Sequence, residues 1–200
     1  GHVAAPTSTS MLHAGVLMKL GAFGILRVAM QLAPEGLVYW APTMATLAAI
    51  GIVYGALAGL AQTDLKYIIG YSSVSHMGVV CLGMSTLTVD GINGAVFQMF
   101  AHGIMTALFF SSVGYIYDRT HTREIYDLGG LSRTMPVASA FFIIAALCGL
   151  GCPGFASFWA EFLVFVATFQ VYPVKGILAV GALVIATLFA LRVIMRAFYV

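Results

Sequence analysis

The sequence predicts an all-α integral membrane protein, and three observations lead to this fold class. The 200-residue chain is 61% hydrophobic and only 8% charged, whereas a soluble domain carries about 25% charged residues. Its apolar stretches reach about 20 residues or more, the length at which a helix crosses about 30 Å of hydrocarbon. Most of the charged residues cluster in the short segments between these stretches.

Six membrane-spanning segments are expected in chain order. They cover roughly residues 8–31, 42–61, 67–87, 92–117, 136–171 and 174–199. The fifth segment is too long for one straight helix and contains Gly151–Gly154 in its middle. Pro153 removes a backbone donor there, and the adjacent glycines permit non-helical geometry. We therefore predict two half-helices joined by a short unwound stretch, which membrane proteins tolerate where protein or a water-filled cavity satisfies the backbone.

The basic residues predict the orientation of the chain in the membrane. Alternate loops place six of them on one face: Lys66, Arg119, Arg123, Arg133, Arg192 and Arg196. The other face holds only Arg27 and Lys175. Because cytoplasmic loops carry an excess of lysine and arginine, the first face is expected to be cytoplasmic.

Three other functional classes are disfavoured. The net charge is only +2 and no basic stripe is interleaved with exposed aromatic residues, so no nucleic-acid partner is expected. Cys81, Cys148 and Cys152 lie in apolar runs with no histidine nearby, which argues against a metal site. The glycines at 149, 151 and 154 match the dinucleotide-binding pattern, but no strand precedes them and Pro153 interrupts them.

Four titratable residues lie near the middles of apolar stretches, where charge is expensive. Lys19 is at the centre of the first stretch, too far from either end for its ammonium group to reach the interface. His76, His102 and Glu161 fall close to the middles of three later stretches. Four such groups at one depth predict a path for protons or ions. The alternative is structural: hydrogen-bonded core histidines, and a carboxylate that caps the broken backbone.

Polar neighbours extend this prediction. The supporting residues are Ser72 and Ser73 at i−4 and i−3 from His76, and Gln98 and Thr106 at i−4 and i+4 from His102. Such stripes inside apolar helices hold water and relay protons, and histidine titrates in the useful range. Glu161 follows the break at Pro153 by about two helical turns, where a carboxyl group is placed to load and release a proton.

Several motifs resemble those of a known family. They are His2–Ser8, Leu17–Arg27, Gln62–Lys66, Tyr71–Gly78, Met99–Gly103 and Tyr117–Arg123. Together they are similar to the antiporter-like membrane subunits of respiratory complex I, over essentially the whole chain. The bacterial M-type chains of NADH:quinone oxidoreductase, equivalent to mitochondrial subunit 4, match best. Glu161 is the main reason, because paralogous chains typically have lysine at that position.

The resemblance implies an inverted-repeat fold with a charged axis along the membrane midplane. Residues 1–32 would form the last helix of the first repeat, and residues 42–200 the second repeat of a longer protein. Lys19 matches the lysine that links the two half-channels. His76 and His102 match the central histidines of the second half, and Glu161 matches the terminal residue on its broken helix.

The implied function is proton translocation coupled to electron transfer, in a bacterial inner membrane rather than a mitochondrial one. NADH, FMN, iron–sulfur clusters and quinone would bind to partner subunits, with no cofactor or redox centre in this chain. Its partners would be other membrane subunits, including paralogous antiporter-like chains, and the lipid bilayer. Two alternatives are open: a subunit of a cation/proton antiporter or membrane-bound hydrogenase, and a passive membrane scaffold.

Overall fold

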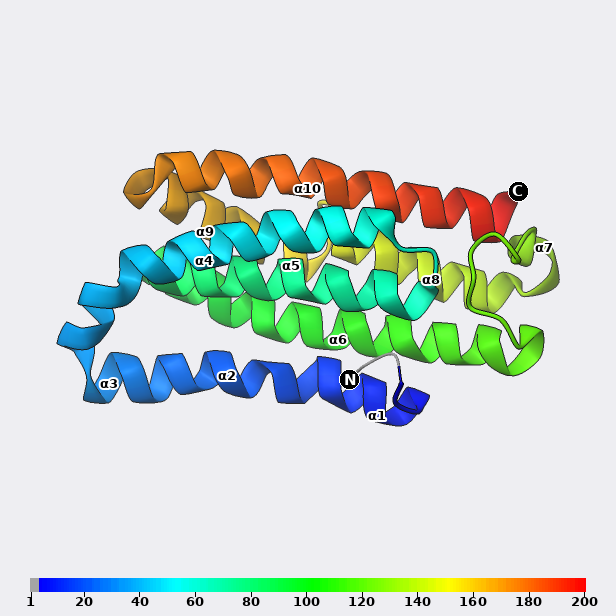
Figure 1. The fold of residues 1–200 in the computed structure, drawn as a ribbon, viewed down its shortest axis with the longest axis horizontal. Coiled ribbons are helices and arrows are strands. Elements are labelled where there is room, and N and C mark those ends of the chain that lie inside the picture. The colour runs from blue at the N-terminus through cyan, green and yellow to red at the C-terminus, as the bar shows by residue number, and fades with distance from the viewer. Residues whose placement is uncertain (1–3) are drawn as a thin grey trace.

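The computed structural model describes residues 4–200 as a bundle of long, roughly parallel helices (Figure 1). The first helix spans Thr7–Leu32 and lies along one side of the bundle. It consists of α1 (Thr7–Leu12), η1 (His13–Leu17), α2 (Met18–Gly24), η2 (Ile25–Ala29) and α3 (Met30–Leu32). The rest comprises α4 (Pro34–Ala61), α5 (Leu65–Ser85), α6 (Val89–Thr120), α7 (Leu131–Thr134), α8 (Pro136–Gly149), α9 (Ala156–Val171), α10 (Pro173–Val193) and η3 (Ile194–Tyr199). His2 and Val3 of the first family-like motif lie outside the described residues.

These helices confirm the predicted all-α membrane architecture. Five helices in the described part of the chain are long and apolar enough to cross a membrane, and α8 and α9 are shorter apolar helices. Most predicted boundaries agree within three residues. The predicted start at residue 42 is wrong, because α4 begins at Pro34. Proline suits the first turn of a helix, and Pro34 takes that place while Pro42 is accommodated inside.

The break in the fifth predicted segment is present. A Schellman turn ends α8: Gly151 donates its N–H to the carbonyl of Cys148, and Cys152 donates to that of Leu147. Gly151 has a φ of +63° and Gly154 one of +104°, conformations that disfavour other residues. The chain therefore stops one helix and starts another within a few residues while keeping the backbone of the turn hydrogen-bonded.

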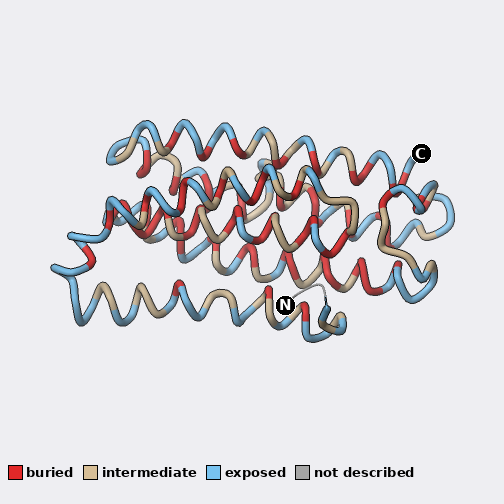
Figure 2. The backbone as a smooth tube through the Cα atoms, viewed as in Figure 1, coloured by how far each residue is buried: buried red, intermediate tan, exposed pale blue. Residues whose placement is uncertain are grey.

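Helix α5 is the most buried of the spanning helices (Figure 2). It packs closely against α4 because glycines remove side chains from the contact. A Cβ atom at Gly55 would lie 2.8 Å from the backbone nitrogen of Ser75, and one at Gly78 would lie 2.6 Å from the side chain of Ile52. Glycines recur every four residues on α4: Gly55 and Gly59 face neighbouring helices, whereas Gly51 faces open space.

We expect Gly55→Val to lower the thermal unfolding midpoint of the protein, because overpacking typically costs about 1–3 kcal/mol. Gly51→Val is the matched control, since it makes the same change one turn earlier where nothing lies within 4 Å. Circular dichroism melting of the two purified full-length variants in detergent compares them. Equal midpoints would contradict the tight α4–α5 contact.

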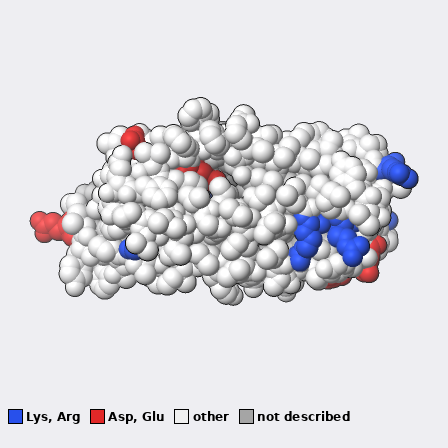
Figure 3. Space-filling model, turned by 90° about the horizontal axis from the view of Figure 1, so that it is seen from above, with Lys and Arg blue, Asp and Glu red and all other residues white. Residues whose placement is uncertain are grey.

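On the face that Figure 3 shows, most charged side chains lie towards the two ends of the bundle, and one small acidic patch is visible near the middle. The helix bounds bring the six basic residues of the predicted cytoplasmic face to one end, next to the α4–α5 turn. Arg27 and Lys175 lie towards the other end. The structure thus supports the grouping on which the orientation was predicted.

The loop after α6 is tied to the α4–α5 turn at this basic end. Asp64 caps α5 by accepting the N–H of Lys66 at 2.7 Å, and it pairs with Arg123 at 3.2 Å. Two backbone bonds of 3.0 Å reinforce the contact, from Leu65 to Arg123 and from Ile125 to Thr63. The loop after α6 is therefore anchored by its backbone as well as by charge.

Candidate functional site

Lys19 reaches into the bundle and contacts His102 on α6. Its Nζ lies 2.7 Å from Nδ1 of His102 and also donates to the carbonyl of Ala14 in the π-helical segment η1. The first helix approaches α6 closely here because both contacting residues are glycines. A Cβ atom at Gly103 would lie 3.0 Å from the carbonyl oxygen of Gly15. The glycine pair therefore lets the lysine reach the histidine.

His76 on α5 and Glu161 on α9 form a buried pair. Nδ1 of His76 lies 3.1 Å from Oε1 of Glu161, and the two residues are 5% and 3% exposed. Gln98 on α6 joins them: its Nε2 donates to the same Oε1 at 3.0 Å. A buried charge is strongly destabilising without partners, so the hydrogen bonds are needed to hold the carboxylate in this place.

The two contacts join into one chain. The rings of His76 and His102 have centroids 5.4 Å apart and planes inclined by 58°. The order is therefore Lys19, His102, His76, Glu161, and it crosses from the first helix through α6 and α5 to α9. The four titratable residues predicted at a common depth are neighbours in the folded chain.

The polar residues predicted to support the four titratable ones make different kinds of contact in the structure. Gln98 contacts His76 and Glu161 through its side chain, instead of extending the stripe of His102 as we predicted. Thr106 is on the predicted face, but its hydroxyl donates to the backbone carbonyl of His102 at 2.8 Å. Within the described residues, the hydroxyl of Ser73 is fully buried with no partner.

A small cavity adjoins the buried pair, with space for about one water molecule. Its polar lining consists of Ser72, Ser75, His76 and Glu161, and its apolar lining includes residues of α4 and α10. Ser75 was not among the predicted residues; it donates to the carbonyl of Ile52 at 3.2 Å. Its position next to His76 was the available signal, but helical periodicity points it in another direction. The cavity brings polar surface to the carboxyl group of Glu161.

The unwound turn is in contact with this pair. A Cβ atom at Gly151 would lie 2.8 Å from Oε2 of Glu161, and one at Gly149 would lie 3.8 Å from Nε2 of His76. Pro153 follows in the turn, and the hydroxyl of Ser157 bonds back to the carbonyl of Cys148. The glycines of the break therefore leave the space that the carboxyl group of Glu161 occupies.

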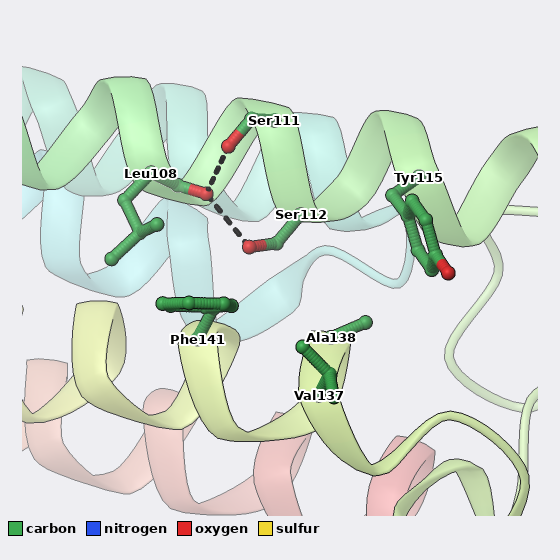
Figure 4. Close-up of a pocket in the computed structure, with 7 residues that line it drawn as sticks. All are labelled: Leu108, Ser111, Ser112, Tyr115, Val137, Ala138 and Phe141. Carbon is green, nitrogen blue, oxygen red and sulfur yellow. Dashed lines mark hydrogen bonds between the residues drawn. The ribbon is translucent and has the colours of Figure 1, made fainter.

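A separate cleft between α6 and α8 adds no link to this chain (Figure 4). It is lined by Leu108, Ser111, Ser112, Tyr115, Val137, Ala138 and Phe141. The hydroxyls of Ser111 and Ser112 both donate to the carbonyl of Leu108, at 2.9 and 2.8 Å. Since these protons are already committed to a backbone acceptor, the cleft offers a mostly apolar surface.

The sequence is similar to named membrane subunits. A family described as NADH:quinone oxidoreductase/Mrp antiporter, transmembrane, matches residues 1–188. NADH-quinone oxidoreductase subunit M of Rickettsia bellii is 41% identical over 96% of this chain and 39% of its own length. Subunit M of Pseudomonas aeruginosa is 41% identical over 99% of this chain and 39% of its own. The chain thus spans about two fifths of the length of the curated relatives it matches.

Solved structures have the same fold. A chain of respiratory complex I from Thermus thermophilus with bound NADH superposes with a TM-score of 0.93 and 32% identity, over 98% of this chain and 42% of that chain. A chain of the Mrp complex from Dietzia superposes with a TM-score of 0.92 at 21% identity, over 97% of this chain and 36% of that chain, which supports the fold alone. With a family match over nearly its whole length and relatives at 41% identity, the chain belongs to the NADH:quinone oxidoreductase/Mrp antiporter family of transmembrane subunits.

Proposed function

We propose that this chain is part of a proton-translocating membrane subunit of an NADH:quinone oxidoreductase. The observation that carries the proposal is the row of contacts from Lys19 through His102 and His76 to Glu161. Each member binds or releases a proton, and each lies beside the next inside a bundle of apolar helices. Such a row is costly to bury without a function, because intramembrane ionisable groups are expensive.

Proton movement along the row follows from the donors and acceptors. The ammonium group of Lys19 donates towards Nδ1 of His102, so a proton passed along this bond leaves a neutral amine and an imidazolium. The tilted rings then exchange the proton by ring rotation or through one bridging water. At the far end, Nδ1 of His76 faces the carboxylate of Glu161, which accepts the proton. The net result is the loss of one positive and one negative charge from the membrane interior.

The remaining assignments carry over the family resemblance described in the sequence analysis. Residues 1–32 form the last helix of one repeat, and residues 42–200 form the second repeat. The partners are other membrane subunits, including paralogous antiporter-like chains, in a bacterial inner membrane. NADH, FMN, iron–sulfur clusters and quinone bind to partner subunits, and this chain converts their electron transfer into proton movement.

Identity favours this proposal over a cation/proton antiporter. The named quinone oxidoreductase subunits are 41% identical to the chain, against 21% for the chain of the Mrp complex. The presence of a complete row of titratable residues also favours transport over a passive scaffold. Sodium dependence of transport would support the antiporter instead.

The histidines test the proposal. We expect His76→Ala and His102→Ala each to lower NADH-driven proton uptake into vesicles that contain the full complex. Each effect should be smaller than that of losing Lys19, because water can bridge one missing ring. The double variant should lose more than the two single effects combined, since residues of one network are not additive.

The control for this experiment is His121→Asn, which changes a histidine in the polar loop at a positive φ that asparagine tolerates. Uptake is compared at equal quinone reduction and equal assembly, with and without sodium. Wild-type uptake in the double variant would exclude the histidines from the path.

A further inference from the structure

We propose that Gln98 is a positioning residue: its amide nitrogen holds the carboxylate of Glu161 against His76 and favours the state in which the proton lies on His76. This inference rests on the proposed function and concerns the last step of the row.

Three polar atoms form a closed triangle at this point. Nε2 of Gln98 lies 3.0 Å from Oε1 of Glu161 and 3.4 Å from Nδ1 of His76, and those two atoms are 3.1 Å apart. Gln98 is 1% exposed, so bulk water does not compete for these contacts. An amide nitrogen has two hydrogens and no acceptor capacity. It therefore donates to the carboxylate oxygen while His76 is protonated, and it can donate to Nδ1 of His76 once that nitrogen has lost its proton.

The proton step changes the charge of the oxygen to which the amide nitrogen of Gln98 donates. Before transfer, His76 is an imidazolium and Glu161 a carboxylate, and the N–H of Gln98 stabilises the negative oxygen. In the step, the Nδ1–H bond of His76 breaks and an O–H bond forms on Oε1 of Glu161, leaving a neutral imidazole and a neutral acid. The new O–H donates back to Nδ1 of His76, which now has a free lone pair, and the N–H of Gln98 then meets a neutral acid, a weaker acceptor than the carboxylate.

The other end of the amide supplies the second observation. Among the described residues, Oε1 of Gln98 is buried and has no hydrogen-bond partner, which leaves a destabilising acceptor in the core. Reversing the amide would set two oxygens against each other while Glu161 is ionised, and it would move the N–H groups away from the carboxylate. The amide therefore keeps its nitrogen on Glu161 although its own oxygen stays without a partner.

Few other groups contact the carboxyl group of Glu161. From α5 the titratable neighbour is His76, and from α6 the polar neighbour is Gln98. The unwound turn contributes Gly151, and the cavity residues of α4 and α10 are apolar, among them Ile52 and Ala179. His102 and Lys19 act on Glu161 through His76. Gln98 is thus the neutral donor closest to the carboxylate.

Infrared difference spectroscopy of the full complex tests this role of Gln98. The carboxylic C=O band of protonated Glu161 is identified by its absence in Glu161→Gln and followed as a function of pH. In Gln98→Met, which keeps the length and removes the donor, we expect the band to persist to a pH about one unit or more above wild type, because the carboxylate loses a hydrogen bond. A glutamine C=O band that shifts together with the Glu161 band should be present in wild type and absent in Gln98→Met.

Gln170→Met is the matched control, since Gln170 is exposed at the end of α9, and Gln98→Leu serves if Gln98→Met does not assemble. A Glu161 band with the wild-type midpoint in both Gln98 variants would overturn the inference. If Glu161→Gln still abolishes proton uptake in that case, the proposed relay stands without a role for Gln98. Full uptake in Glu161→Gln would count against the relay itself.

Discussion

Lys19→Ala should leave the complex assembled and lower NADH-driven proton uptake at least about tenfold, the effect of about 1.4 kcal/mol on a barrier. Alanine is the best helix former, so the first helix keeps its shape. The substitution removes the cation at the start of the row, and with it the contact to His102 at 2.7 Å.

The test compares proton uptake with NADH oxidation in vesicles containing the purified complex. Arg27→Ala is the matched control, because it removes a cation from the same helix about two turns further on. Uptake should be normal in the control and strongly reduced in Lys19→Ala at equal assembly. An unchanged ratio of protons to NADH in Lys19→Ala would remove the lysine from the path.

Glu161→Gln should have an effect of similar size at the other end of the row. Glutamine has nearly the same shape as glutamate and still accepts a hydrogen bond from Gln98 through its oxygen. It does not take up a proton, so the pair with His76 can no longer exchange one. Proton uptake should fall at least about tenfold, while assembly is unchanged because the buried contacts are kept.

Glu161→Asp distinguishes titration from shape. The shorter carboxyl group still binds a proton but does not reach the position 3.1 Å from His76, so uptake should be partly retained. Wild type, Glu161→Gln and Glu161→Asp are compared by the proton uptake per quinone reduced. Wild-type uptake in Glu161→Gln would mean that the carboxyl group only fills the space beside the unwound turn.

Much of the fold was readable from the sequence because hydrocarbon allows few backbone solutions. The length of each apolar stretch gave a helix, and the glycines and proline at residues 151–154 gave the break. The start of α4 was not readable, since Pro34 and Pro42 are both compatible with a first turn. The π-helical segments could not be predicted from the sequence either, because no residue type in them distinguishes a wider helical turn from an ordinary one.

The site was readable in part for a similar reason. Periodicity shows which face of a helix a side chain occupies, and polar residues in the middle of apolar helices stand out. It does not show which neighbouring helix that face meets. Gln98 was therefore assigned to the stripe of His102, whereas its amide reaches across to Glu161 on α9. The hydroxyl of Thr106 had a local backbone acceptor that a face diagram does not display.

The two wider turns of the first helix affect how related sequences should be aligned. In η1, Met18 donates to the carbonyl of His13, five residues back, and in η2 Met30 does the same with Ile25. Each segment therefore holds one residue more than an ordinary turn needs. One residue corresponds to about 100° of rotation, and Lys19 lies between the two segments. A one-residue gap in an alignment of this helix would therefore not mean a shorter loop. It would mean that the side chain of Lys19 points in a different direction.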